Sequence, residues 1–259
     1  MHITLTGNLG SGKSTISRLM SEQYGYEIYS TGKIMRQLAA ERGLTVLEMN
    51  HLMETDHSFD NIIDDTVRKI SEETSEDLFF DSRLAWHFAV NSFKVFLAVD
   101  INEAARRVFN DSRGDVETYA DILDAKSKLI ERAHTENARY KDIYGIEYFK
   151  PTNYNLILDS TFTSPNILAE MIQIEKQHYE ELVSTGHTPT KPRILLSPNR
   201  LCGMKSGNTR DNSDIYESHA IVQMKIETFE VKSGMEEIGD AAVSGYEFIS
   251  VEDESTVNH

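Results

Sequence analysis

A glycine-rich loop near the start of the chain has residue types and spacing suited to binding phosphate groups. Residues 7–14 read Gly-Asn-Leu-Gly-Ser-Gly-Lys-Ser, which matches the pattern G-x-x-x-x-G-K-[ST]. The loop follows a predicted strand and opens a predicted helix, so backbone N–H groups and the positive helix end would both face a phosphate. We expect Lys13 to reach the β- and γ-phosphates of a nucleotide and Ser14 to ligate Mg²⁺. The expected nucleotide-binding residues are Gly7, Asn8, Leu9, Gly10, Ser11, Gly12, Lys13, Ser14 and Thr15.

Arginines at the predicted edge of the sheet are candidates for a second phosphate-bearing ligand, because a guanidinium forks onto two phosphate oxygens. Arg132 and Arg139 are seven residues apart on one predicted helix and therefore share a face. Glu136 lies between them, so ion pairing along the helix is the alternative interpretation. The candidate arginines are Arg36, Arg83, Arg107, Arg132 and Arg139.

The overall charge limits the classes of partner. The 259 residues include 26 Lys and Arg against 42 Asp and Glu, a formal net charge of −16. Such a chain repels nucleic acid and anionic membranes, so we expect neither as a partner, and a phosphate ligand needs a local cationic cluster. The single Cys202 excludes an intrachain disulfide. No run approaches the ~20 apolar residues that span a bilayer, and the N-terminus has no signal-peptide pattern, so we expect a cytoplasmic location.

Short apolar runs alternate with longer amphipathic stretches through the first 185 residues. This alternation predicts an α/β fold in which helices flank a five-stranded parallel sheet. The expected strands are 3–6, 26–29, 77–81, 94–99 and 154–158. The expected helices are 13–24, 33–42, 46–54, 59–73, 102–110, 116–144 and 165–183, with Gly25 ending the first of them.

The composition changes after about residue 185. Three of the five prolines, Pro189, Pro192 and Pro198, fall within ten residues, and a segment rich in Gly, Asn and Ser follows. We therefore expect two domains, 1–185 and a small α+β unit at 186–259. The expected strands of that unit are 193–196, 220–225, 228–231 and 247–251, with a short helix near 235–244.

Several short motifs, in order along residues 1–185, resemble the nucleoside-monophosphate kinases, closest to the compact archaeal and bacterial cytidylate kinases. The resemblance implies a P-loop kinase fold with ATP and Mg²⁺ as cofactors and small nucleotides as substrates. The segments that carry it are Ser30-Thr31-Gly32 with Arg36, the stretch 41–48, Asp81-Ser82-Arg83-Leu84-Ala85-Trp86, Arg139-Tyr140 with Tyr144-Gly145-Ile146, and Asp159-Ser160-Thr161.

The resemblance also implies roles for individual residues. Ser30, Arg36 and Arg83 would hold the acceptor phosphate, and Glu136 would lie near the acceptor nucleoside. Asp81 would hold Mg²⁺ through water, beside Ser14. Arg107, Arg132 and Arg139 would act over the transferring phosphoryl group, with the region 116–139 as a closing lid.

Three positions depart from the family pattern. Lys33 replaces a usual Asp, and Ser82 replaces a usual Gly. Asn155 stands where a Tyr-Asp pair is common. A cation at Lys33 puts efficient handling of the metal in doubt, and the Ser82 side chain would crowd an approaching phosphate. An impaired or retuned kinase is therefore one hypothesis.

The motifs together predict ATP-dependent phosphoryl transfer to CMP or dCMP, giving the diphosphate. One alternative is a nucleotide-binding regulatory protein with little or no turnover, and another is a P-loop kinase for a different small acceptor. Lys13→Ala is expected to abolish turnover.

The segment after residue 186 resembles a ParB/sulfiredoxin-like domain at 194–200 and 229–251. A Gly-His-His-Arg motif carries phosphate chemistry in that family, but the aligned residues here are Gly234-Met235-Glu236-Glu237. We therefore expect no catalysis from this unit. We expect a binding or oligomerisation module, with another copy of the chain or a protein as its partner.

Overall fold

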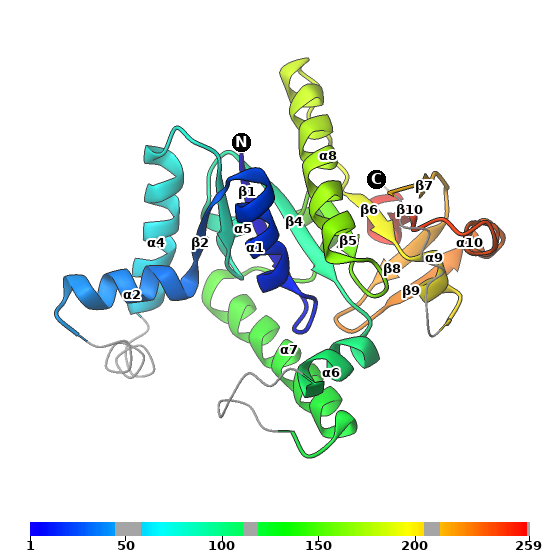
Figure 1. Cartoon of the computed structure of the whole chain (residues 1–259), viewed down its shortest axis with the longest axis horizontal. Coiled ribbons are helices and arrows are strands. Elements are labelled where there is room, and N and C mark those ends of the chain that lie inside the picture. Colours follow the sequence, from blue (N-terminus) through cyan, green and yellow to red (C-terminus); the bar gives the residue numbers. More distant parts are fainter. Residues whose placement is uncertain (45–57, 111–118, 205–212, 258–259) are drawn as a thin grey trace.

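A ten-stranded sheet organises the described residues of the chain (Figure 1). The computed structural model describes residues 1–44, 58–110, 119–204 and 213–257, and at 32, 35–37 and 58–61 it describes the backbone alone. The first five strands run parallel in the order β2-β3-β1-β4-β5, which confirms the predicted fold class. Their bounds are β1 (His2–Gly7), β2 (Glu27–Ser30), β3 (Leu78–Asp81), β4 (Ser92–Ala98) and β5 (Leu156–Asp159).

The apolar residues of the central strands explain why helices cover both faces of the sheet. All of β1 and β5 is buried, as expected for parallel strands with two covered faces. Successive residues of β4 alternate between two cores: Phe93, Val95 and Leu97 belong to one cluster, and Phe96 and Ala98 to the other. The sheet thus separates two packed layers.

The helices connect the parallel strands and form the two layers. α1 and α8 pack together on the first face, while α6 and α7 pack against each other beyond the carboxyl ends of the strands. The helices of this part are α1 (Lys13–Tyr24), α2 (Thr31–Glu41), α4 (Ser58–Glu73), α5 (Ala85–Phe88), α6 (Ile101–Asn110), α7 (Ile122–Tyr144) and α8 (Pro165–Ser184), with the 3₁₀ turn η2 (Pro151–Asn153).

The C-terminal segment continues the same sheet. β6 pairs in parallel with β5, β10 pairs antiparallel with β6, and β8 and β9 follow, while β7 pairs with β10. Its core is shared with the first part, because Ile194, Ile238 and Ile249 join the cluster that contains Phe96. The boundary near residue 186 therefore falls before a strand of the common sheet, and a division into two domains stays a prediction. The elements are β6 (Arg193–Leu196), α9 (Pro198–Leu201), β7 (Ile215–Tyr216), β8 (Ile221–Met224), β9 (Phe229–Ser233), α10 (Met235–Val243), β10 (Phe248–Asp253) and α11 (Glu254–Val257).

Capping side chains account for the main shifts in helix bounds. α2 begins at Thr31, two residues earlier than predicted, because the Ser30 hydroxyl accepts a hydrogen bond from the Lys33 N–H at 3.2 Å. α7 begins at Ile122 because Asp121 caps it in the same way. Gly25 ends α1 with a φ of 75°, as predicted. The predicted helix 46–54 and residues 116–118 of the predicted lid lie outside the described residues.

Among the helices that the structure describes, none is both long enough and apolar enough to cross a membrane.

Candidate active site

The loop between β1 and α1 has the backbone geometry of a phosphate cradle. Gly7 has a φ of 148°, and a Cβ atom there would lie 2.2 Å from the carbonyl oxygen of Leu97 in β4. Gly12 has a φ of 92° and precedes the first turn of α1. Only glycine meets both demands, so the loop can approach β4 closely and then turn its N–H groups toward the start of the helix.

Lys13 lies over this loop rather than in solvent. Its Nζ donates to the carbonyl oxygens of Gly7 at 3.0 Å and Asn8 at 2.8 Å. Burial and the nearby Arg83 guanidinium lower the pKa of Lys13 to about 7, and the Asp81 carboxylate opposes this shift. The ammonium is therefore held next to positive charge, which an arriving polyphosphate would relieve.

Asp81 ends β3 beside the loop. β1 and β3 pair with Leu5 opposite Asp81, so the carboxylate lies next to the strand that leads into the phosphate loop. The Ser17 hydroxyl, one turn into α1, donates to Asp81 Oδ2 at 2.8 Å. Ser14 is exposed at the start of α1. The oxygen atoms of Asp81 and Ser14 are suited to Mg²⁺, which binds through one or two protein oxygens and retains several waters.

Arg83 and Arg132 converge on one carboxylate from different elements. Arg83 follows β3 and its Nη1 is bonded to Glu136 Oε2, while Arg132 Nε donates to Glu136 Oε1 at 3.0 Å. Arg83 and Glu136 are 25% and 21% exposed, so this pair is more shielded than a surface ion pair. Both arginines lower the pKa of Lys13. The ion pair of Arg132 with Glu136 is the alternative that the sequence offered, whereas the contact of Arg83 with the same carboxylate was not foreseen.

Tyr148 was missed in the sequence and lies directly under the loop. Its hydroxyl is hydrogen-bonded to Thr6 Oγ1 and accepts from the Gly7 N–H at 3.3 Å. The ring is buried, and burial raises the pKa of the hydroxyl above its ordinary value. The quoted Tyr-Gly-Ile segment ends two residues before Tyr148, so only its position near that segment could have suggested a role.

Arg107 joins the phosphate loop to the turn after β5. Its Nη2 donates to the carbonyl oxygens of Ser160 at 2.7 Å and Thr161 at 3.0 Å, and its Nη1 donates to Gly10 O at 3.4 Å. Glu103 Oε1 accepts from Arg107 Nε at 2.8 Å. The guanidinium is thus used to position backbone in this structure.

A pocket of about 280 Å³ opens between the phosphate loop, α6 and the start of α8. Thr163 is one of its lining residues, and its buried hydroxyl has no hydrogen-bond partner among the described residues. The pocket has room for a ring. Its lining residues are Ser11, Gly12, Thr15, Ile16, Glu103, Arg106, Arg107, Ser160, Thr163, Pro165 and Leu168.

Lys33 points away from the loop. Its Nζ donates to Glu27 Oε1 at 2.8 Å and lies 4.1 Å from the centre of the Tyr29 ring. Glu27 begins β2, at the amino end of the sheet, opposite the end that carries the phosphate loop. The concern raised by this substitution therefore finds no support in the position of the ammonium.

The remaining predicted residues contribute differently. The Ser82 hydroxyl accepts from Thr31 Oγ1 at 3.0 Å, at the turn that precedes Arg83. Arg139 is exposed on α7 and lies close enough to Tyr140 to oppose the rise in that hydroxyl's pKa. Only the backbone of Arg36 is described, so the place of its side chain stays a prediction.

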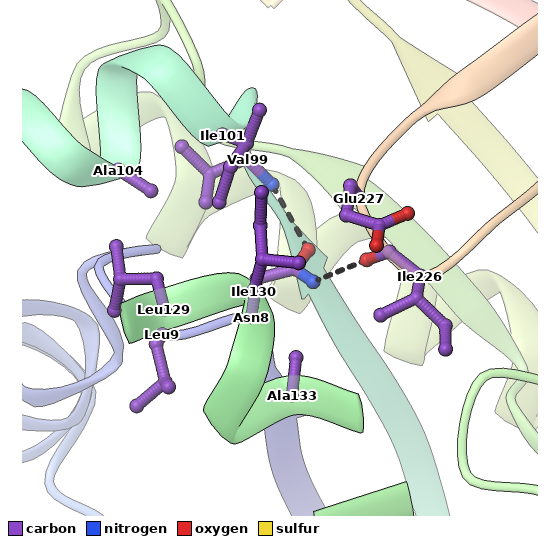
Figure 2. Close-up of a pocket in the computed structure, with 10 residues that line it drawn as sticks. All are labelled: Asn8, Leu9, Val99, Ile101, Ala104, Leu129, Ile130, Ala133, Ile226 and Glu227. Carbon is purple, nitrogen blue, oxygen red and sulfur yellow. Dashed lines mark hydrogen bonds between the residues drawn. The ribbon is translucent and has the colours of Figure 1, made fainter. Parts of the chain in front are cut away.

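Asn8 brings the C-terminal segment to the phosphate loop. Its side-chain oxygen accepts from the Val99 N–H, and its Nδ2 donates to the Ile226 carbonyl oxygen, both at 3.3 Å (Figure 2). The neighbouring Glu227 is hydrogen-bonded to His134 of α7 at 2.5 Å. The turn between β8 and β9 therefore lies between the phosphate loop and α7, a contact that no local sequence pattern indicated.

The strand–loop–helix arrangement and the parallel sheet define a P-loop nucleotide-binding protein. The chain belongs to the cytidylate kinase-like family, whose model matches residues 2–162. The resemblance seen in the sequence is thus confirmed.

Known proteins support this assignment. The chain is 34% identical over 174 residues to a cytidylate kinase of Methanoregula boonei, a match that covers 66% of this chain and 92% of that one. It is 30% identical over 204 residues to an S-adenosylmethionine-dependent nucleotide dehydratase of Lacinutrix mariniflava, where the match covers 78% of this chain and only 40% of the relative. A crystal structure of an uncharacterised protein from Eubacterium ventriosum shares the fold, with a TM-score of 0.50, 15% identity and coverage of 67% of this chain and 97% of that one.

Proposed function

We propose that the protein transfers the γ-phosphoryl group of ATP to a nucleoside monophosphate, with CMP or dCMP as the acceptor. The observation that carries this proposal is the cluster of Arg83, Arg132 and Glu136 beside Lys13. It provides local positive charge for two phosphate-bearing ligands in a chain whose net charge is −16.

The donor nucleotide would occupy the phosphate loop and the adjacent pocket. Lys13 would exchange its contacts with the Gly7 and Asn8 carbonyl oxygens for the β- and γ-phosphates of ATP. The base would enter the 280 Å³ pocket between the phosphate loop, α6 and the start of α8. Arg139 would add charge over the transferring group when α7 closes. Arg107 would add its charge from α6 while it keeps its contacts with the turn after β5, and the loop residues 7–15 would surround the phosphates.

The acceptor would bind by displacing Glu136 from its arginines. A monophosphate accepts bidentate hydrogen bonds from Arg83, with Arg36 and Ser30 at the start of α2 as further contacts. The freed Glu136 carboxylate then accepts from the amino group of cytosine, a donor that the other pyrimidines, uracil and thymine, lack. The carboxylate that now neutralises the cluster would in this way favour the cytidine nucleotide.

Phosphoryl transfer here needs positioning and charge neutralisation more than proton transfer. The acceptor phosphate is already anionic near pH 7, so no general base is required. Ser14, and Asp81 through water, would hold Mg²⁺, which would supply neutralisation of the phosphate charge of the donor nucleotide. Arg132 and Lys13 offset the charge that spreads over the equatorial oxygens.

A nucleotide-binding regulatory protein is the second candidate. The hydrogen bond between Asn8 and Ile226 favours a regulatory function, because a change in the conformation of the phosphate loop would directly alter the position of the C-terminal segment. That segment would then serve a protein partner or a second copy of the chain. The family's named activities are properties of the relatives, and the dehydratase relative is a much longer protein.

The test is a product assay on the purified full chain with Mg-ATP and a panel of monophosphates, together with non-nucleotide small acceptors. We expect diphosphate formation with CMP and dCMP, loss of turnover in Lys13→Ala, and turnover close to the parent in Lys33→Ala. The second variant is a matched control, because Lys33 is a lysine near the site whose ammonium faces Glu27. ATP binding without turnover would support the regulatory function, and activity confined to a non-nucleotide would refute the nucleotide acceptor.

A further inference from the structure

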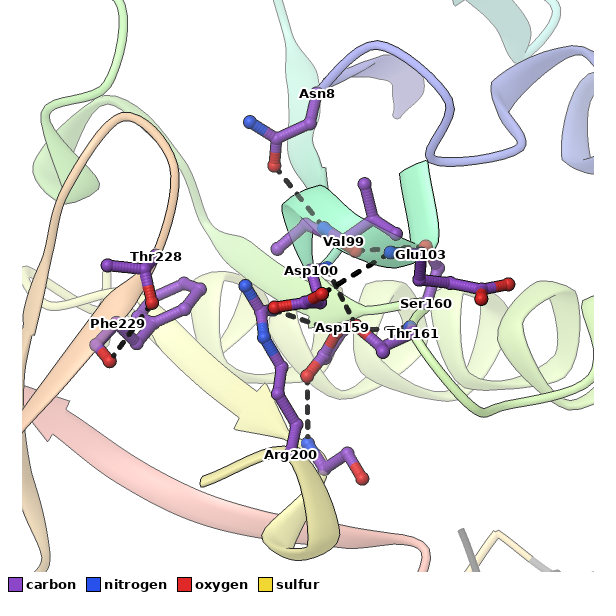
Figure 3. A network of polar contacts seen from close by, with 12 residues as sticks. Asn8, Val99, Asp100, Glu103, Asp159, Ser160, Thr161, Arg200, Thr228 and Phe229 are labelled. Atoms are coloured by element: carbon purple, nitrogen blue, oxygen red, sulfur yellow. Dashed lines mark hydrogen bonds and ion pairs between the residues drawn. The ribbon is translucent and has the colours of Figure 1, made fainter. Parts of the chain in front are cut away.

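A buried ion pair connects the C-terminal segment to the end of β5. Arg200 of α9 donates from Nη1 to Asp159 Oδ1 at 3.0 Å (Figure 3). The side chains are 7% and 0% exposed, so both charges are removed from water. Asp159 is the last residue of β5, and Ser160 and Thr161 follow it in the turn that faces the phosphate loop.

The Asp159 carboxylate is the centre of the local hydrogen bonds. Its Oδ1 accepts from the Thr161 N–H at 3.1 Å and from the Thr161 hydroxyl at 2.6 Å, and its Oδ2 accepts from the Ser197 N–H at 3.2 Å. A fully buried carboxylate loses its hydration, and a cation and several donors must compensate that loss. Arg200 supplies that cation, and its guanidinium also stacks 5.2 Å from the Phe229 ring.

Asp159 and Arg107 both form hydrogen bonds with the turn 160–161 that follows β5. Arg107 donates to the carbonyl oxygens of Ser160 and Thr161 and to Gly10 of the phosphate loop. Ser160 also lines the pocket beside the loop. Contacts therefore run without a break from Arg200 through Asp159 and the turn to Arg107 and the phosphate loop.

We propose that Arg200 is a positioning residue for nucleotide binding, which acts by fixing Asp159 and the turn 160–161 against Arg107. The proposal rests on the proposed use of the pocket beside the phosphate loop by ATP. It gives residues 186–259 a part in the nucleotide site itself, in contrast to an appended module with a separate purpose.

The contact of Ile226 with Asn8 agrees with this role but is independent of it. Two parts of the C-terminal segment reach the nucleotide site. The turn between β8 and β9 contacts the first residues of the phosphate loop, and α9 contacts the end of β5, just before the turn 160–161. Misplacement of a positioning group by about 1 Å reduces binding or catalysis by up to about a hundredfold. A measurable effect from a residue in α9 is therefore expected.

The experiment measures the dissociation constant of a fluorescent ATP analogue on the full chain in a double-mutant cycle. The variants are Arg200→Met, Asp159→Asn, the double variant, and Arg200→Lys. Arg193→Met is the matched control, since Arg193 is also a shielded arginine of this segment but pairs with Glu217, Glu175 and Ser250. Binding of CMP and the midpoint of thermal unfolding are measured in parallel.

We expect Arg200→Met and Asp159→Asn each to weaken ATP binding about tenfold, and the double variant to be no weaker than either single variant. Arg200→Lys should recover most of the affinity, and CMP binding and Arg193→Met should stay within about threefold of the parent. ATP affinity within about twofold of the parent in folded Arg200→Met would overturn the proposal. A double variant about a hundredfold weaker would overturn it too, because the two residues would then act independently.

Two further outcomes are informative. If Arg200→Met alone does not fold, the comparison of Asp159→Asn with the double variant decides, since the double variant leaves no unpaired buried charge. Equal affinities support the role of Arg200, and a further loss overturns it. If the parent chain itself fails to bind ATP, the proposed donor site is wrong and the positioning role falls with it. If it binds ATP but does not phosphorylate CMP, the proposed transfer to CMP is wrong and the positioning role of Arg200 is still tested by ATP affinity.

Discussion

The lowered pKa of Lys13 predicts that nucleotide affinity falls as the pH rises above neutrality. Burial and the neighbouring Arg83 bring the pKa of this lysine to about 7 in the free protein. A bound triphosphate would return it toward the ordinary value of 10.5, because the charged form gains anionic partners. Binding between these two pH values therefore takes up a proton, and each further pH unit costs up to about tenfold in affinity.

For a free pKa of about 7 and a bound pKa near 10, the dissociation constant increases about fiftyfold between pH 7 and pH 9, and about tenfold if the free value is 8. The range avoids the last ionisation of the nucleotide's own phosphates. The assay is titration calorimetry at pH 7, 8 and 9 in two buffers of different ionisation enthalpy, which reports both the affinity and the proton uptake. Mg²⁺ is kept constant throughout.

Lys13→Arg is the control, because a guanidinium stays protonated across this range and removes the proton uptake. We expect its affinity to change less than about threefold between pH 7 and pH 9. A parent chain with the same flat profile would refute the reasoning, because Lys13 would then be charged before the nucleotide arrives. The same shift has a stability consequence: the unfolded chain binds more protons than the folded chain between the two pKa values, so folding stability gains from Lys13 as the pH rises from about 7 toward 10.

Three other predictions test separate parts of the site. Arg132→Ala should lower kcat by about a hundredfold and change acceptor KM less than about threefold, because its charge acts on the transition state; steady-state kinetics with varied CMP measure this, and a normal kcat would remove Arg132 from the mechanism. Tyr148→Phe should lower the free energy of unfolding by about 1–3 kcal/mol, because the Gly7 N–H loses its buried acceptor; urea unfolding measures the change, and a loss below about 0.5 kcal/mol would show that water or relaxation replaces the hydroxyl. Gly7→Ala should prevent ATP binding, because its Cβ atom would lie 2.2 Å from the Leu97 carbonyl oxygen; Gly25→Ala, with no atom within 4 Å of the added Cβ, is the matched control for strain at positive φ alone, and fluorescence titration that found normal affinity in Gly7→Ala would contradict the close-packed loop.

Features carried by local patterns were predictable from the sequence. The phosphate loop was predictable because its backbone conformation requires glycine at fixed positions. The five parallel strands were predictable because apolar runs alternate with amphipathic helical stretches. Arg83 was predictable for the same reason, because it follows a strand at the edge of the sheet where ligands bind. For the phosphate loop and Arg83, the place in the sequence relative to a strand is enough to predict the place at the carboxyl edge of the sheet.

Features that depend on distant contacts were not predictable. Lys33 lies in the first turn of α2, but its direction is set by Glu27 and the Tyr29 ring of β2, and only the folded backbone shows that it turns back. Asp159 and Arg200 are 41 residues apart and carry no shared motif. The composition change near residue 186 indicated a separate unit, yet strand pairing between β5 and β6 depends on backbone hydrogen bonds that composition does not encode.

The pairing of β6 with β5 also affects the tendency of the chain to aggregate with other copies through an open sheet edge. In a five-stranded core β5 is an edge strand, and its four fully buried residues Leu-Ile-Leu-Asp would border a row of open backbone donors and acceptors. β6 closes that row, and the sheet ends instead at β9, where Glu230 forms ion pairs with Lys225 and Lys232. Charged edges discourage pairing with other chains. During synthesis the protective strand emerges after the apolar one, so the chain is most exposed to aggregation in the interval between them.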